Sequence, residues 1–284
     1  MKEVSKILFP TDFSATAENA WRYCLMLADR YQASILITHV VYPEYEMMDL
    51  PTVAARATTE KIDVVKTNLL PAFIDRGLTQ VQAGNLVKSL PEVYEEVEIG
   101  APVEAITRLA KNEDIDLIVM GTQGEHNLLE KVFGSVAAGV IAHAHCPVWV
   151  VPEDAAVKPV SVAVYASDLR EADPLQIWRA GKLLEPFGVT MNCVHISDGE
   201  SLEDAMDFAV LGGFFENKSP ALQIQFHSLT GKDISIELET FSNDCKADLV
   251  IMYGPHYGFW DRLFHKSQTR KMAMTTTRPL LVLR

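Results

Sequence analysis

The chain has 284 residues, of which 48% are hydrophobic and 22% are charged, and its formal net charge at pH 7 is −13. This length accommodates two domains of ordinary size. The acidic surplus is shared by both halves and no basic run occurs, which argues against nucleic acid or anionic membranes as partners, since phosphate binding needs clustered Lys and Arg.

The apolar segments are too short for a signal peptide or a membrane span, so we expect a cytoplasmic protein. The four cysteines are widely spaced: Cys24, Cys146, Cys193 and Cys245. They show neither metal-ligand spacing nor a Cys-x-x-Cys motif, and are expected to be buried thiols. His143 and His145 stand at the end of an expected helix, where the helix dipole alone favours histidine, so no metal site is predicted.

A strand, a loop and a helix open the chain. Residues 6–9 form a short apolar strand that Pro10 ends, and Ser14 stands where the N-cap of the following helix belongs. Asp12 lies in the loop at the carboxyl end of the strand, the edge at which open α/β sheets bind ligands. Capping the helix and contacting a ligand both remain open as roles for Asp12.

The alternation of strands and helices continues through the first half. Strands are predicted at residues 35–41, 93–99, 116–120 and 148–151, and helices at 59–73, 103–112 and 135–144. His39, near the end of the second strand, is expected to be a hydrogen-bonded core histidine rather than a catalytic one. Five strands alternating with four helices indicate a parallel, doubly wound sheet.

The segment from residue 119 to residue 136 combines glycines with a helix start. Gly121 ends a buried strand, and Gly121 and Gly124 lack a Cβ, so a flat ligand can approach the backbone. Gly134 and Ser135 open a helix whose unpaired N–H groups favour an anion. An ordinary strand exit followed by an ordinary helix start is the alternative. The strand-glycine-helix context favours a nucleotide loop, although not of the Walker or the dinucleotide type.

The second half repeats the first after a polar linker, which predicts domains at residues 1–152 and 153–284. Four segments carry the repeat: Ala166-Ser167-Asp168 answers Pro10-Thr11-Asp12, Cys193-Val194-His195-Ile196 answers Thr38-His39-Val40-Val41, residues 247–252 answer residues 115–120, and residues 278–283 answer residues 146–151. The two halves are therefore expected to share one fold.

The repeat breaks at the glycine loop. Tyr253, His256 and Lys266 stand where Gly121, Gly124 and Gly134 stood, so we expect the second half to have lost nucleotide binding. The apolar stretch at residues 205–215 surrounds Gly212-Gly213. It is interpreted either as a helix that packs on the sheet and then breaks, or as an apolar cleft for an acyl or similar ligand.

These motifs, taken together, resemble the universal stress protein family. Residues 7–14, Ile-Leu-Phe-Pro-Thr-Asp-Phe-Ser, are similar to its opening strand and loop, and residues 116–121 to its fourth strand. Gly121-x-x-Gly124, nine residues and Gly134-Ser135 are similar to the motif of its ATP-binding branch. The resemblance implies an α/β protein with two tandem flavodoxin/Rossmann-like domains. Each would be a five-stranded parallel sheet with helices on both faces.

The resemblance also implies an ATP site in the first domain, with or without Mg²⁺. The family would assign adenine and ribose contacts to Asp12, Val40, Gly121 and Gly124, phosphate contacts to Gly134, Ser135 and Val136, and the lining of the same pocket to Pro10, Thr11 and Met120. It further implies that residues 148–151 pair with residues 280–283 in an intrachain pseudo-dimer. A homodimer remains open, and the protein partners are unidentified.

We therefore expect a cytoplasmic stress-response protein that binds ATP in its first domain and acts as a regulatory binding module. A slow ATPase or nucleotide-dependent transferase is the alternative, and an apolar ligand in the second domain is a further one. No residue set predicts turnover: the spacing shows no Ser-His-Asp or Cys-His arrangement and no second acid to hold Mg²⁺ beside Asp12. Enzymatic activity is thus left open and is not predicted.

Overall fold

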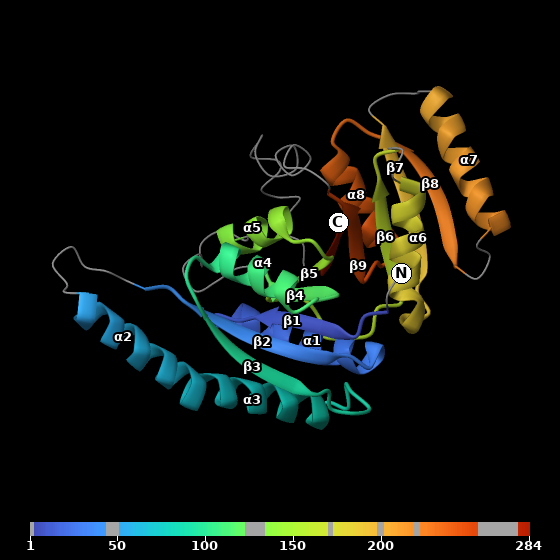
Figure 1. Cartoon of the computed structure of the whole chain (residues 1–284). Helices are drawn as coiled ribbons and strands as arrows, with labels where there is room; N and C mark the ends of the chain where they lie inside the picture. The colour runs from blue at the N-terminus through green and yellow to red at the C-terminus, as the bar shows by residue number, and fades with distance from the viewer. Residues whose placement is uncertain are drawn as a thin grey trace. The chain divides into compact units, whose positions relative to one another are not determined.

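The computed structural model describes residues 3–43, 51–122, 134–169, 173–197, 202–218, 222–254 and 278–284. The chain divides into two compact units, one comprising Val4–Lys158 and the other comprising Pro159–Arg284 (Figure 1). Within the described ranges, every helix is too short or too polar to span a lipid bilayer.

The first unit contains a parallel sheet with the strand order β3-β2-β1-β4-β5. Its strands are β1 (Lys6–Pro10), β2 (Ser34–Val41), β3 (Val93–Ile99), β4 (Leu117–Gly121) and β5 (Val148–Val151). The chain order changes direction between β1 and β4, and open α/β sheets bind ligands at such a switch point, outside the carboxyl ends of the strands. The predicted α/β class and strand positions are confirmed.

The helices of the first unit cover both faces of this sheet. They are α1 (Ala15–Tyr31), α2 (Pro51–Val64), α3 (Leu70–Ala83), α4 (Pro102–Asn112) and α5 (Ser135–His143). Helices α1 and α3 contact each other, as do α4 and α5. Figure 1 shows α3 on one side of β1 and β2 and the α4–α5 pair on the other side.

The helix predicted at residues 59–73 is longer than expected, because helical structure runs from Pro51 to Ala83 through a π-helical turn at Val65–Leu69. In that turn the Leu70 N–H donates to the Val65 carbonyl. The wider turn accommodates Pro71, which has no N–H to donate. Gly77 lies within α3, where a Cβ would stand 2.1 Å from Cδ1 of Trp21, so the close packing of the helix on this ring requires a glycine.

The second unit has the same topology, with the strand order β10-β9-β6-β7-β8 and parallel pairing. Its elements are β6 (Val162–Ser167), α6 (Asp173–Leu184), a 3₁₀ turn (Glu185–Phe187), β7 (Thr190–Ser197), α7 (Leu202–Lys218), β8 (Ile224–Thr230), α8 (Ile234–Asp244), β9 (Leu249–Tyr253) and β10 (Leu280–Leu283). The predicted repeat of the fold is confirmed. The pairing expected between Val148–Val151 and Leu280–Leu283 stays a prediction.

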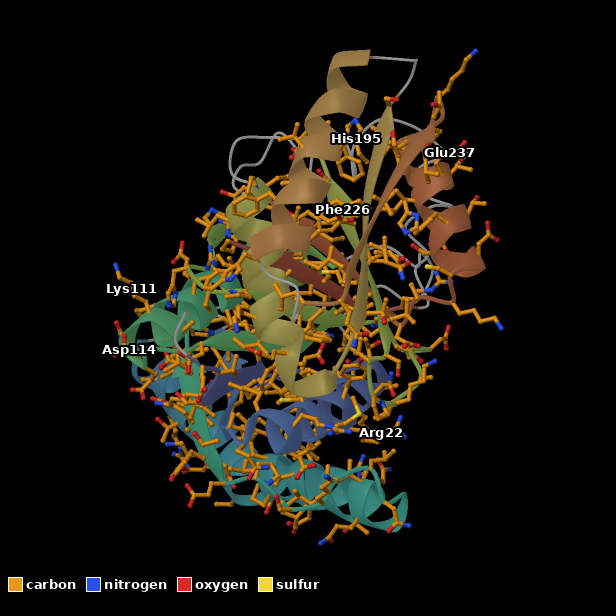
Figure 2. All side chains as sticks on the ribbon, turned by 90° about the vertical axis from the view of Figure 1, so that its right-hand side faces the viewer. Arg22, Lys111, Asp114, His195, Phe226 and Glu237 are labelled. Atoms are coloured by element: carbon orange, nitrogen blue, oxygen red, sulfur yellow. The ribbon has the colours of Figure 1, made fainter. Side chains whose placement is uncertain are left out.

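The apolar stretch of the second half lies in α7, which continues through Gly212 and Gly213, so the predicted break is wrong. The rings of Phe208 and Phe215 pack on Phe226 of β8, with centroids 5.5 and 5.9 Å from it. Figure 2 shows Phe226 beside α7. A Cβ at Gly212 would stand 3.5 Å from the Phe226 ring, which is an ordinary van der Waals contact, so this packing does not require a glycine.

The polar segment after Pro152 is attached to α1. The buried Asn19 side chain donates through Nδ2 to the carbonyls of Pro152 and Ala155, both at 2.9 Å. The Thr16 hydroxyl donates to the Glu153 carboxylate at 3.0 Å. Residues 152–155 therefore belong to the packing of the first unit.

Candidate functional site

A cavity of about 360 Å³ lies at the carboxyl ends of β1, β2 and β4, within the size range of small-molecule sites. It is lined by Pro10, Thr11, Asp12, Ala17, Thr38, His39, Val40, Pro102, Ile106, Met120, Gly121, Thr122, Gly134, Ser135, Val136 and Ala137. Nine of the ten residues predicted from the sequence are in this set. The tenth, Gly124, lies outside the described residues.

At one end of the cavity, Val40 presents unpaired peptide groups. The backbone groups of the odd-numbered residues Ile35 and Val41 of β2 form hydrogen bonds on the side of β3. The backbone groups of the even-numbered residues therefore point toward β1, as the bond from the Thr11 N–H to the Thr38 carbonyl shows. Val40 is the next residue to face that side, but β1 has already ended. Among the described residues, the Val40 N–H and carbonyl have no partner, so an adjacent donor and acceptor face the cavity.

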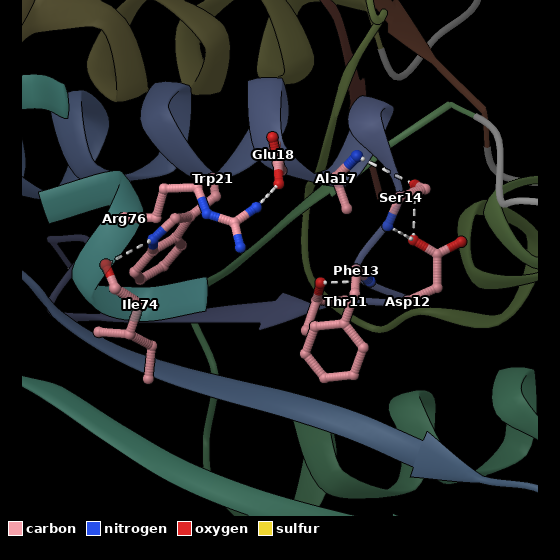
Figure 3. A network of polar contacts seen from close by, with 9 residues as sticks. All are labelled: Thr11, Asp12, Phe13, Ser14, Ala17, Glu18, Trp21, Ile74 and Arg76. Atoms are coloured by element: carbon pink, nitrogen blue, oxygen red, sulfur yellow. Dashed lines mark hydrogen bonds and ion pairs between the residues drawn. The ribbon is translucent and has the colours of Figure 1, made fainter. Parts of the chain in front are cut away.

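The loop after β1 is held by short side-chain bonds (Figure 3). The N–H and the hydroxyl of Ser14 both donate to Oδ1 of Asp12, at 3.1 and 2.7 Å, and the Ser14 hydroxyl accepts from the Ala17 N–H. Ser14 is the N-cap of α1, and Asp12 orients it. Oδ2 of the exposed Asp12 side chain has no partner among the described residues and is available to a ligand.

Phe13 adopts a left-handed conformation, with φ of 66°, which non-glycine residues seldom adopt. Its N–H donates to the Thr11 hydroxyl at 3.0 Å. Its ring stacks on His39 with centroids 4.7 Å apart and meets Phe73 edge-on at 5.6 Å. These ring contacts stabilise a backbone turn that directs Asp12 toward the cavity.

The opposite end of the cavity is the start of α5. Gly134 is the N-cap, and no side chain caps the helix. The Ala138 N–H makes the first helical bond, to the Gly134 carbonyl. The N–H groups of Ser135, Val136 and Ala137 consequently have no partner among the described residues. Together with the positive end of the helix dipole, they form a site suited to an anion.

Gly121 is required here for packing against α1, a reason that differs from the one expected. A Cβ at this position would lie 2.9 Å from Cγ2 of Thr16, and 3.4 Å from the Thr16 backbone. Thr16 is buried, and its hydroxyl is held by Glu153. The glycine therefore lets α1 approach the end of β4, which brings Ala17 to the cavity wall.

Comparisons with known proteins show the family to which the chain belongs. The sequence profile of the universal stress protein family matches residues 3–152. The chain belongs to the universal stress protein family. A universal stress protein of Methanocaldococcus jannaschii is 29% identical over 153 residues, which cover 51% of this chain and 93% of that protein.

Solved universal stress proteins extend the likeness of fold to both units. One from Archaeoglobus fulgidus has a TM-score of 0.73 at 17% identity, and the match covers 99% of this chain and 97% of that one. A further one from Pseudomonas aeruginosa has a TM-score of 0.59 at 12% identity and covers 99% of this chain and 93% of that one. At these identities the likeness concerns the fold alone, and it supports a tandem arrangement of two universal stress protein folds.

The register of the repeat differs by one residue from the sequence alignment at β7. His195 Nδ1 lies 3.2 Å from the Ser167 carbonyl, as His39 Nδ1 lies 2.8 Å from the carbonyl of Thr11. The residue that corresponds to Val40 is therefore Ile196, and the predicted match of His195 with Val40 is wrong. Strands buried on both faces give no alternation by which the sequence could fix this register.

Asp173 is the residue of the second universal stress protein fold that sequence reasoning missed. It begins α6 and follows Ser167 at the same chain spacing at which Ala17, which lines the cavity, follows Thr11, and it is 1% exposed. The hydroxyls of Tyr165 and Ser167 donate to its two carboxylate oxygens at 3.0 and 2.6 Å. Burial raises the pKa of Asp173, and the hydrogen bonds from these two hydroxyls offset part of this increase. Of the loop substitutions, Tyr253 ends β9, and His256 and Lys266 lie outside the described residues.

Among the described residues that line the cavity, the ionisable side chains are those of Asp12 and His39. His39 uses Nδ1 on the Thr11 carbonyl, and Oδ1 of Asp12 is used by Ser14. Beyond the open Oδ2 of Asp12, the described lining offers peptide groups, hydroxyls and apolar side chains. This arrangement is suited to holding a polar ligand with a flat apolar part and an anionic end.

Proposed function

We propose that the first unit binds ATP and acts as a nucleotide-dependent regulatory module. The observation that carries the proposal is the arrangement of one cavity, with an unpaired donor and acceptor on Val40 at one end and the unpaired start of α5 at the other. Adenine presents an acceptor at N1 beside a donor at the 6-amino group, which complements Val40. The triphosphate complements the helix start.

The remaining lining residues support the same orientation. Met120, Pro102 and Ile106 provide apolar walls for a purine ring. Asp12 follows β1, the strand that lies between β2, which carries Val40, and β4. Its open Oδ2 can accept from a ribose hydroxyl. Gly121 ends the adjoining strand β4 and Thr122 follows it, and the Thr122 carbonyl accepts from the Gly134 N–H at 2.7 Å.

Binding rather than turnover is the function that the lining favours. Phosphoryl transfer needs a group that orients the attacking nucleophile and cations that neutralise the transferred phosphoryl group. No Lys or Arg is among the described residues that line the cavity, and its one histidine already bonds to the Thr11 carbonyl. Mg²⁺, if it accompanies ATP, would be held by the phosphates with Asp12 as the nearest carboxylate in the lining.

Titration calorimetry with ATP and with adenosine tests the proposal. We expect saturable binding of one ATP per chain. The variant Ser135→Pro removes one N–H and the hydroxyl at the first helical position, where proline is favoured, and the preceding Gly134 is already extended. It should weaken ATP at least about tenfold while adenosine binding changes little.

The matched control is Ile234→Pro at the first position of α8, which should leave both affinities unchanged. Absence of saturable ATP binding to the intact chain, or equal losses of ATP and adenosine affinity in Ser135→Pro, would overturn the proposal. Release of labelled phosphate over many turnovers would show instead that the site is an ATPase.

A further inference from the structure

The backbone hydrogen bonds between β1 and β2 end with the bond from the Thr11 N–H to the Thr38 carbonyl, before β2 itself ends. In a parallel pair, the bond from Thr11 N–H to the Thr38 carbonyl would be followed by one from Val40 N–H to the Thr11 carbonyl. The next would join Phe13 N–H to the Val40 carbonyl. Neither bond is present among the described residues, so the ladder is interrupted at Val40.

Two side chains replace these two missing bonds. His39 Nδ1 lies 2.8 Å from the Thr11 carbonyl, and because a carbonyl only accepts, the ring nitrogen must donate. The Phe13 N–H donates instead to the Thr11 hydroxyl, at 3.0 Å (Figure 3). The Thr11 carbonyl and the Phe13 N–H are thereby bonded without Val40, whose own donor and acceptor stay unpaired among the described residues.

We infer that His39 and Thr11 are positioning residues for base recognition: they keep the Val40 N–H and carbonyl out of the β ladder, so that a purine can take them. The inference rests on the proposed ATP site and deepens it. His39 governs the N–H that meets N1 of the base, and Thr11 governs the carbonyl that meets the 6-amino group. The ring of Phe13, stacked on His39, holds the imidazole in place.

The second unit contains the same replacement of two backbone bonds by side-chain bonds, so the arrangement is a feature of the fold and is not confined to one loop. His195 Nδ1 lies 3.2 Å from the Ser167 carbonyl, and the Leu169 N–H donates to the Ser167 hydroxyl at 3.3 Å. Leu169 has φ of 54°, the left-handed conformation that Phe13 has. The same two bonds, and a left-handed residue at the corresponding position, thus occur in both copies of the fold.

Hydrogen exchange at the Val40 amide, measured by NMR without ligand, tests the interruption directly. In the wild type we expect this amide to exchange at least about tenfold faster than the ladder-bonded amides of β2. The variant His39→Leu frees the Thr11 carbonyl, so the Val40 N–H should close onto it and become protected. His39→Asn keeps a donor at the position of Nδ1 and should leave the Val40 amide exposed.

Affinity for base analogues tests the role in recognition. The wild type should prefer ATP over 1-deaza-ATP, which lacks the N1 acceptor, by about tenfold. His39→Leu should erase this preference, and His39→Asn should retain it within about threefold. Thr11→Val should erase instead the preference for ATP over purine riboside triphosphate, which lacks the 6-amino group. A merely structural role would lower all affinities together and leave these ratios unchanged.

His195→Leu is the matched control in the second unit and should leave ATP binding as it is. Slow exchange of the Val40 amide in the wild type would overturn the inference, whatever the nucleotide affinity. An unchanged preference of His39→Leu for ATP over 1-deaza-ATP would overturn it as well. If the intact chain binds no ATP, the proposed function fails, and the exchange measurement still decides whether His39 holds the ladder open.

Discussion

Asp173 in the second unit corresponds by chain spacing to Ala17 in the first, and its buried carboxylate accepts hydrogen bonds from the hydroxyls of Tyr165 and Ser167. Ala17 lines the cavity at the start of α1. The same place in the fold is therefore open and neutral in one copy and occupied by an acid in the other. A carboxylate disfavours a phosphate nearby, because like charges repel strongly where water is excluded.

The first prediction transfers this acid into the first unit. Ala17→Asp should weaken ATP binding by about a hundredfold or more, because it adds a charge and volume to the cavity wall. Ala17→Asn adds nearly the same volume without the charge and should weaken binding much less. Calorimetric titration of both variants separates the two effects. Equal losses would show that size, and not charge, distinguishes the two units.

The second prediction concerns pH. Burial raises the pKa of Asp173 above its ordinary value of 3.8, so the folded chain holds this proton more tightly than the unfolded chain. The contribution of Asp173 to stability is therefore fully present below the unfolded pKa and is lost as pH rises through the folded pKa.

Asp173→Asn removes this titration. The free energy of unfolding of the variant, relative to that of the wild type, should increase as pH rises from about 4 toward neutrality and then level off. Urea unfolding curves at a series of pH values measure it. A difference that stays constant over the whole series would mean that the carboxyl of Asp173 titrates normally in the fold.

The third prediction concerns the contact of Gly121 with α1. Gly121→Ala would place a methyl group 2.9 Å from Cγ2 of Thr16 and should destabilise the fold by about 1–3 kcal/mol. Thr16→Ser removes Cγ2 but keeps the hydroxyl that donates to Glu153. In the double variant, part of the loss should be recovered, giving a coupling of about 0.5–3 kcal/mol in a double-mutant cycle. If the losses in stability are additive, the destabilisation by Gly121→Ala does not arise from its contact with Thr16.

The fourth prediction separates capping from ligand binding. Ser14→Ala removes the cap of α1 and one of the two donors that orient Asp12. It should cost about 1 kcal/mol of stability and also weaken ATP binding. Asp233→Ala removes the cap of α8, where the carboxylate accepts from Ser235 and Ile236, and should cost stability alone. Thermal unfolding and ATP titration of both variants check the contrast.

The strands and the position of the cavity were predictable because short apolar runs and a change of chain direction are local signals. The run of Leu117, Ile118 and Val119 indicates a buried parallel strand, and the place of Asp12 after β1 indicates the ligand edge. Gly121 was also identified, although its packing against Thr16 involves residues far apart in the chain, which no local pattern reveals.

The remaining features depend on contacts between distant residues. The helix predicted at residues 59–73 accommodates Pro71 through a π-helical turn, and its continuation to Ala83 includes Gly77, where a Cβ would collide with the ring of Trp21. Asp173 looks in the sequence like an ordinary helix-capping acid, and its burial is visible only with Tyr165 beside it. Such pairs become recognisable only when the fold has brought them together.

The interrupted ladder at Val40 bears on how this protein can vary. The groups that would meet the base belong to the main chain, which every residue other than proline supplies in full. An alanine scan of the cavity would record position 40 as neutral, and drift from Val to Ile or Leu there would leave recognition intact. The determinant of base preference would thus be hidden from any method that reads side-chain identity.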